Sequence, residues 1–132
     1  MDTGYFRIEG LDREYLQDPR VKIVEPGGEV FFVLDGGEVV GCCAVIKHSA
    51  QTYELCKMAV ARDAQGRGLA NLLMDAVIDF AREHNAERIF LLSNTKLEPA
   101  LRLYGKYGFR TTGLGPSPDY ERADIELELE LD

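Results

Sequence analysis

The sequence predicts an α/β (α+β) domain with one mixed central sheet. Three observations support this fold class. Two strand-like runs flank an Asp-Gly-Gly turn at residues 35–37, which is typical of an antiparallel hairpin. An apolar strand at 53–60 leads through a glycine loop into an amphipathic helix and then another apolar strand, which predicts one parallel β-α-β crossover. The chain ends in an alternating strand at 123–131, so antiparallel strands are expected at both ends of the sheet.

Composition limits the classes of protein and partner. With 132 residues, 45% of them hydrophobic, the chain should form a single domain, residues 1–132. The formal net charge of −8 and the lack of a basic run argue against nucleic acid or an anionic membrane as partner. No stretch approaches 18 apolar residues and the start lacks a signal pattern, so we expect a cytoplasmic protein.

The cysteines and histidines form no metal pattern, and no metal is expected. Cys42, Cys43 and Cys56 are an odd number in apolar, strand-like settings, which predicts reduced, buried thiols. Neighbouring Cys42 and Cys43 should point to opposite faces of a strand. Neither His48 nor His84 is placed by the sequence to activate a cysteine, which disfavours a cysteine nucleophile.

The first part of the chain should be mainly strands. Residues 12–16 suggest one or two helical turns that end near Asp18-Pro19, and Pro26-Gly27-Gly28 predicts a turn. The strands expected before the glycine loop span residues 5–8, 29–34, 38–46 and 53–60.

The helix that follows the glycine loop has an apolar and a polar face. The apolar positions that recur at helical spacing are Leu69, Leu72, Leu73, Ala76, Val77 and Phe80. The polar positions are Asn71, Asp75, Asp79 and Arg82. Next, the nearly continuous apolar run at 88–92 is typical of a strand covered on both faces.

The last third of the chain predicts a short helix and two strands. The helix should run from about Glu98 to Tyr107 and stop at Gly108. A strand begins at Phe109, and a loop from Gly113 to Pro118 separates it from the final strand. In that strand three glutamates share one face, which is either an acidic wall that binds amines or, as we favour, a solvated face: Glu126, Glu128 and Glu130.

The glycine loop has the features of an anion site. Gly66 and Gly68 let the backbone turn tightly and approach a ligand. The first amides of the helix have no intrahelical partner, and together with the helix dipole and the Arg67 guanidinium they would suit a pyrophosphate. The loop fits neither the dinucleotide pattern nor the P-loop pattern.

Two stretches resemble the GNAT superfamily of N-acetyltransferases. Gln65-x-x-Gly68-x-Ala70, straight after Met58-Ala59-Val60, resembles the acyl-CoA-binding motif Q/R-x-x-G-x-G/A. The stretch from Asn94 to Phe109 resembles the later motif N-x(5)-A-x(3)-Y-x(3)-G-F. The resemblance covers roughly residues 20–131 and implies the mixed GNAT fold. In the family the loop amides hold the pyrophosphate of CoA and the preceding strand binds the pantetheine arm. The implied acetyl-CoA-binding residues are Met58, Ala59, Val60, Gln65, Gly66, Arg67, Gly68, Leu69, Ala70, Asn94 and Tyr104.

The resemblance also implies catalytic residues. Tyr104 matches the tyrosine that protonates the departing thiolate, although an aromatic residue on a short helix would by itself suggest core packing. Glu54 lies eleven residues before Gln65, similar to the glutamate base of histone-type members. A solvated or salt-bridged strand glutamate is an equally open interpretation of Glu54.

The implied activity is acetyl-CoA-dependent N-acetylation of a primary amine by direct transfer in a ternary complex. The acceptor is either a small-molecule amine or an amine of a peptide or protein. Two alternatives stay open: a non-catalytic acyl-CoA-binding regulatory module, and a structural domain with an incidental glycine turn. The usual N-terminal strand and two helices of the family are compressed here into fewer than thirty residues, so the acceptor site is expected to be open or to borrow a partner subunit. Exposed strand edges favour a homodimer.

Overall fold

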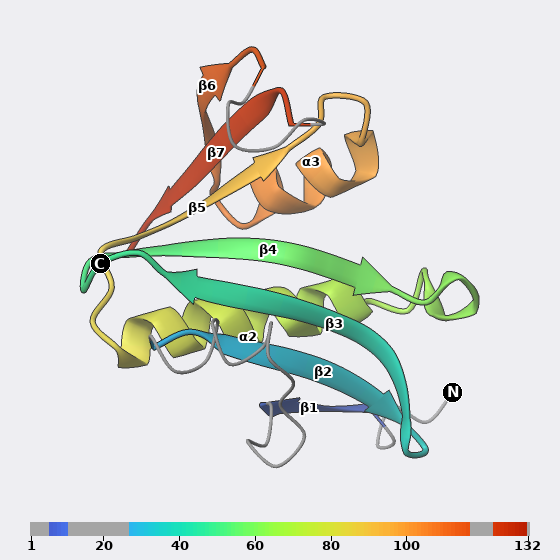
Figure 1. Cartoon of the computed structure of the whole chain (residues 1–132). Coiled ribbons are helices and arrows are strands. Elements are labelled where there is room, and N and C mark those ends of the chain that lie inside the picture. Colours follow the sequence, from blue (N-terminus) through green and yellow to red (C-terminus); the bar gives the residue numbers. More distant parts are fainter. Residues whose placement is uncertain (1–5, 11–26, 117–122, 132) are drawn as a thin grey trace.

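A seven-stranded mixed sheet forms the centre of the molecule, as the sequence predicts (Figure 1). The computed structural model describes residues 6–10, 27–116 and 123–131. The strand order is β1-β2-β3-β4-β5-β7-β6, and of these neighbours β4 and β5 alone are parallel. The strands are β1 (Phe6–Gly10), β2 (Glu29–Asp35), β3 (Glu38–Lys47), β4 (Thr52–Val60), β5 (Arg88–Ser93), β6 (Arg110–Leu114) and β7 (Ile125–Glu130). The helical turns predicted at 12–16 lie outside the described residues.

The hairpin of β2 and β3 forms at the predicted turn. Gly36 and Gly37 both have positive φ, 60° and 92°, which is the conformation of the tight hairpin turns that match strand twist. Asp35 pairs with Glu38 across the turn. The prediction of an antiparallel start to the sheet is therefore confirmed.

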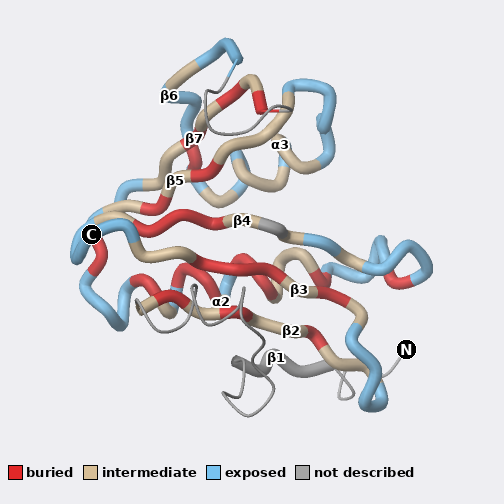
Figure 2. Tube along the Cα trace, in the orientation of Figure 1, coloured by how far each residue is buried: buried red, intermediate tan, exposed pale blue. Residues whose placement is uncertain are grey.

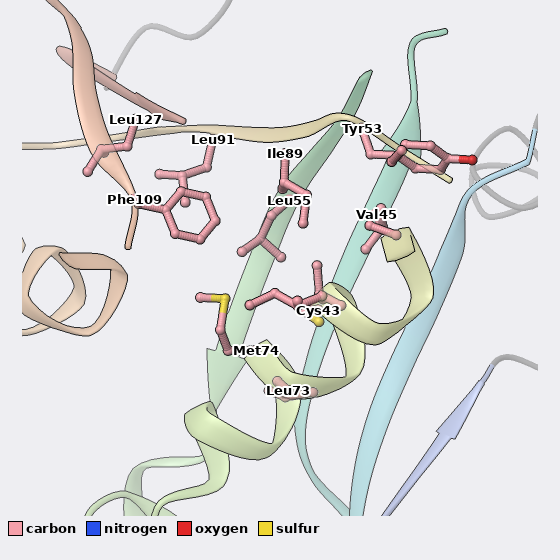
Figure 3. Packing of buried hydrophobic residues seen from close by; sticks show 14 of the residues in the cluster. Cys43, Val45, Tyr53, Leu55, Leu73, Met74, Ile89, Leu91, Phe109 and Leu127 are labelled. Carbon is pink, nitrogen blue, oxygen red and sulfur yellow. The ribbon is translucent and has the colours of Figure 1, made fainter. Parts of the chain in front are cut away.

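Helix α2 (Leu69–Glu83) covers the face formed by β2, β3 and β4. Its buried residues are Leu69, Leu73, Met74, Val77, Ile78 and Ala81. Figure 3 shows Leu73 and Met74 projecting toward Cys43 of β3 and Leu55 of β4. Leu72, Ala76 and Phe80, which the spacing placed in the core, are half-buried. The buried face of α2 is therefore rotated from the predicted face by about one residue, or about 100°. The sequence did not separate the two faces because they differ little in hydrophobicity.

The C-terminal part packs α3 (Glu98–Lys106) beside β5, β6 and β7 (Figure 1). Gly108, with φ of 98°, ends the helical segment where predicted. The prediction that β5 is covered on both faces is wrong. Ile89 and Leu91 are buried, but Phe90 and Leu92 on the other face are half-buried. Leu92 borders a pocket described below, and Phe90 lies against the ring of His48.

The three glutamates of β7 contact polar partners on their face of the sheet. Glu128 lies 3.9 Å from Arg88, and Glu130 lies 3.4 Å from Arg110. The Thr112 hydroxyl donates to Glu126 over 3.2 Å. These contacts agree with a polar, partly solvated face and give no support to an acidic amine-binding wall.

The parallel pairing between β4 and β5 is short. It joins Thr52 to Arg88, Tyr53 to Ile89 and Glu54 to Phe90, and then stops. Beyond this point the two strands diverge (Figure 1). After Glu54, none of the strands in the described ranges pairs with β4 on that side. On its other side, β4 pairs with β3 through a β-bulge. Cys42 and Ala44 of β3 pair with Ala59 and Cys56 of β4, so β4 has one extra residue between the two pairs.

Of the three cysteines, one is fully buried. Cys43 is 1% exposed, whereas Cys42 and Cys56 are half-buried, and none of the three forms a disulfide in the described part of the chain. Burial, reinforced by the neighbouring Cys42 and Cys56, raises the pKa of Cys43 from 9.0 to about 12. The thiol therefore stays protonated and is a poor nucleophile.

We expect this thiol to make the fold sensitive to alkali. Above pH 9 the unfolded chain ionises the thiol while the folded chain keeps it protonated, so the free energy of unfolding falls as pH rises toward 12, by roughly 4 kcal/mol over the whole range. Cys43→Ala should flatten this decline, although it lowers stability at neutral pH by about 1–2 kcal/mol. Urea unfolding at pH 8, 9.5 and 10.5 measures the slopes, and parallel slopes for both proteins would contradict the assignment.

Candidate active site

The loop after β4 has the backbone conformation of an anion cradle. Gly66 and Gly68 have φ of 85° and 78°, a region that favours glycine. Gly68 is the N-cap of α2 and no side chain caps the helix. Within the described part of the chain, no backbone acceptor satisfies the amides of Leu69 and Ala70, as expected in a first helical turn. The loop is largely exposed (Figure 2), so these amides face a site that a ligand can reach.

A pocket of about 430 Å³ lies against this loop. It brings together the end of β4, the start of α2 and one side of α3. Its lining residues are Met58, Ala59, Val60, Ala64, Gln65, Gly66, Gly68, Leu69, Ala70, Asn71, Pro99, Ala100, Leu103 and Tyr104. The side-chain amide of Gln65 donates to the Val60 carbonyl over 3.2 Å and so ties the loop to the strand.

Two of the residues predicted to bind the acyl donor do not line this pocket. The Arg67 guanidinium lies 3.4 Å from the carboxylate of Asp35, at the tip of the β2–β3 hairpin, and its side chain is 41% exposed. Asn94 lines a different pocket, described next. Its side-chain oxygen accepts a hydrogen bond of 2.9 Å from the Lys96 amide and shapes the turn that leads into α3.

A second pocket, of about 390 Å³, lies on the other side of the diverging strands. Its lining residues are Ile46, Glu54, Cys56, Met58, Leu92, Ser93, Asn94, Leu97, Tyr104 and Ala123. Met58 and Tyr104 belong to both pockets. The two pockets therefore meet where β4 leaves β5, and the two predicted catalytic residues lie in the second one.

Glu54 is the single buried charged residue in the described ranges, with 4% exposure. Its Oε1 lies 2.8 Å from Nε2 of His48, just beyond the end of β3. The solvated-glutamate interpretation is therefore wrong. The salt-bridge interpretation applies through His48, and this contact is an ion pair only when the imidazole is protonated. Sequence reasoning missed His48 because the pairing of Ile46 with Glu54, which brings His48 near, depends on the register of β3 and β4.

Tyr104 sits between the two pockets in its protonated form. Burial, with a smaller contribution from Cys43, raises the pKa of the phenol above its ordinary value near 10. Its ring packs against that of Phe109, with the centroids 5.9 Å apart. The residue can therefore donate a proton at neutral pH, and its ring is held by packing.

The described residues hold neither a helix long and apolar enough to cross a membrane nor any group of three or more His, Cys, Asp and Glu suited to a metal ion. What they do hold is an anion cradle, a phenol and a buried carboxylate around one junction. This arrangement suits the transfer of a group between two ligands that enter from opposite sides.

Comparison with known proteins agrees with this geometry. The model of the acetyltransferase (GNAT) family matches residues 3–109. An uncharacterized N-acetyltransferase of Mycobacterium bovis is 33% identical over 100 residues, which are 76% of this chain and 60% of that protein. N-acetylaspartate synthetase of Rattus norvegicus is 37% identical over 109 residues, 80% of this chain and 36% of the relative. The chain thus spans about 60% or less of the length of these relatives.

Solved structures share the fold at low identity. A GNAT family acetyltransferase from Elizabethkingia anophelis with acetyl-CoA bound superposes with a TM-score of 0.78 at 22% identity, over 97% of this chain and 99% of that one. A GNAT acetyltransferase from Staphylococcus aureus reaches a TM-score of 0.82 at 18% identity, over 96% and 99% of the two chains.

Proposed function

Because the chain belongs to the acetyltransferase (GNAT) family, we propose that it transfers the acetyl group of acetyl-CoA directly to a primary amine in a ternary complex. The observation that carries the proposal is the meeting of two pockets at Met58 and Tyr104. One pocket borders an anion cradle and the other contains a buried carboxylate. Two substrates bound side by side would therefore meet at this junction, and no covalent acyl-enzyme is needed.

The first pocket would hold the acyl donor. The amides between Gln65 and Ala70 would bind its pyrophosphate, since they point outward at the positive end of the α2 dipole. The Arg67 guanidinium would add positive charge at the rim of the loop, where it now contacts Asp35. The unpaired side of β4 from Met58 to Val60 would form main-chain hydrogen bonds to the pantetheine arm.

The second pocket would hold the acceptor amine next to Glu54. A lysine-like amine has a pKa near 10.4, so deprotonating it at pH 7 costs about 4.6 kcal/mol. Glu54 would take this proton and leave the nitrogen lone pair free to attack. Among the described residues that line it, the acceptor pocket is mainly apolar apart from Glu54, Ser93, Asn94 and Tyr104, so it would suit an amine on a short apolar body better than a highly hydroxylated one.

Two further groups would stabilise negative charge on the thioester, one at its carbonyl oxygen and one at its departing sulfur. Backbone amides of β4 around Met58 would donate to the carbonyl oxygen as negative charge develops there. Tyr104 would donate its proton to the departing sulfur. In the family a tyrosine at this place in the motif has that role, and here burial keeps the phenol protonated.

The names of the relatives refer to different acceptors, so the acceptor of this chain does not follow from them. We infer either a small-molecule amine or the exposed amine of a peptide or protein. A cytoplasmic location and a homodimer formed through a sheet edge stay predictions from the sequence.

An amine panel tests the proposed function. Release of CoA thiol from acetyl-CoA is measured against small amines, amino acids and peptides, together with the thermal shift caused by acetyl-CoA. We expect stabilisation of about 3 kcal/mol at a hundredfold excess over Kd, and turnover with at least one amine class. Stabilisation without turnover on any amine would favour a non-catalytic acyl-CoA-binding module. No stabilisation would favour a structural domain.

A further inference from the structure

We propose that His48 is a positioning residue for Glu54 that also carries the amine's proton from the buried carboxyl group to solvent. This inference rests on the proposed function, because it assumes that Glu54 accepts the proton of the acceptor amine. It adds a residue that neither of the two family motifs includes.

The contact between the two side chains connects the inside of the protein to the outside. Glu54 is 4% exposed and lines the acceptor pocket, so a proton that it accepts has little direct access to bulk water. Its Oε1 lies 2.8 Å from Nε2 of His48, and the histidine side chain is 46% exposed. A single imidazole thus spans the distance from a buried carboxyl group to the surface.

Local structure holds the imidazole in this position. Ile46 pairs with Glu54, and His48 follows two residues after Ile46, on the same side of the chain. The His48 amide donates to the Thr52 carbonyl over 2.9 Å, which closes the turn between β3 and β4. The imidazole also lies against the ring of Phe90, with the centroids 5.2 Å apart.

Other titratable groups share this face of the sheet. They are Cys42 on β3, Cys56 on β4, Arg88 on β5, Arg110 on β6 and the three glutamates of β7, with Tyr104 facing the pocket from α3 and Lys47 preceding the histidine. Arg88 contacts Thr52 and Glu128. The ring nitrogen of His48 contacts Glu54 alone among the interactions found in the described ranges. A pH effect that depends on both Glu54 and His48 is therefore assigned to this pair.

The proton balance is simple. The substrate N–H bond breaks and an O–H bond forms on Glu54, which leaves a neutral amine. The Glu54 O–H bond then breaks and an N–H bond forms on the imidazole, which becomes a cation. The exposed ring releases one proton to water and returns to its neutral form, and Glu54 is again a carboxylate.

Three variants separate the two roles of His48. In His48→Gln the side-chain amide still donates to Glu54 but carries no proton, whereas His48→Ala removes both functions. His84→Gln is the matched control, because the chain has two histidines and His84 stacks on Phe80 in the last turn of α2, outside both pockets.

We expect His48→Gln to lower kcat about tenfold at pH 7 and His48→Ala, which also loses the positioning contact, to lower it further, both with unchanged Kd for acetyl-CoA. Free imidazole should restore most of the activity of His48→Ala, since the vacated position is open to solvent. The His84→Gln control should show neither effect. In a Glu54→Gln background, removal of His48 should cost no further activity, because the two residues act in series. Wild-type kcat in His48→Gln, or no rescue by imidazole, would overturn the proton-carrying role.

A second readout does not depend on turnover. In ¹⁵N spectra of the imidazoles, the His84→Gln variant assigns the two histidines, and Glu54→Gln should then shift the Nε2 signal of His48 and leave that of His84 unchanged. A shift in a protein that acetylates no amine would mean that the contact exists but the proposed function is wrong. An unchanged His48 signal would overturn the contact itself, whether or not the protein is an active enzyme.

Discussion

Gly68→Glu is expected to weaken acetyl-CoA binding more than a hundredfold while the fold survives. The residue has φ of 78° and caps α2, so a glutamate there is held in a strained conformation that costs roughly 1–2 kcal/mol. A β-carbon at this position would meet only the Asn71 side chain at 3.8 Å, which is ordinary contact. The larger effect is electrostatic, because the new carboxylate would occupy the anion cradle and repel a pyrophosphate.

Titration calorimetry with acetyl-CoA measures this loss, and thermal unfolding checks the fold. Gly115→Glu is a suitable control, since Gly115 also has positive φ, 115°, with nothing within 4 Å of its β-carbon, and lies outside both pockets. It adds the same charge at another glycine of positive φ. An affinity of Gly68→Glu within threefold of wild type would refute the placement of the pyrophosphate.

Tyr104→Phe should lower kcat by about a hundredfold at pH 7 and leave the Kd for acetyl-CoA nearly unchanged. The substitution keeps the ring that packs on Phe109 and removes only the hydroxyl group. Burial raises the pKa of this phenol above its ordinary value, so Tyr104 is largely protonated near neutral pH and can act as the acid there. A thiol has a pKa near 8.5, so at higher pH a thiolate leaves with less need for an acid.

The defect of Tyr104→Phe should therefore be largest near neutrality and narrow above pH 9. Values of kcat measured from pH 6.5 to 9.5 test this pH dependence, with Tyr53→Phe as the control. Tyr53 is another buried tyrosine of raised pKa, but it packs against Phe80 on the α2 side of the sheet. Equal rates for Tyr104→Phe and wild type across this range would remove Tyr104 from the mechanism.

Local patterns in the sequence were sufficient for the elements and their connections. The two glycines of the hairpin, the glycine loop before α2 and the alternation in β7 each depend on residues close in the chain, and the structure confirms these features. Predictions of burial failed where an apolar side chain could lie either in the core or beside a pocket. Leu92 is as hydrophobic as a core residue, but it borders a pocket, and hydrophobicity alone does not distinguish the two environments.

Contacts between distant residues were also beyond the sequence. Arg67 contacts Asp35, which is 32 residues away, and nothing in either local pattern indicates this pair. Asn94 lines the second pocket because β5 diverges from β4, a feature of the sheet rather than of the motif. His48 reaches Glu54 only in the observed register of β3 and β4. A single sequence therefore does not reveal which side chains of a site are brought together by the register of two strands.

The short pairing of β4 with β5 has a consequence for acyl-chain selectivity. Only three residue pairs connect the two halves of the sheet, so no ladder of main-chain bonds fixes how far apart the strands lie beyond Glu54 and Phe90. That separation depends instead on the bulk of the side chains packed beneath, among them Leu55, Ile89 and Leu91 (Figure 3). Trimming one of these interior leucines or isoleucines would let the two strands move closer, whereas a larger side chain would hold them further apart. Tolerance for propionyl or longer thioesters would then depend on residues in the core.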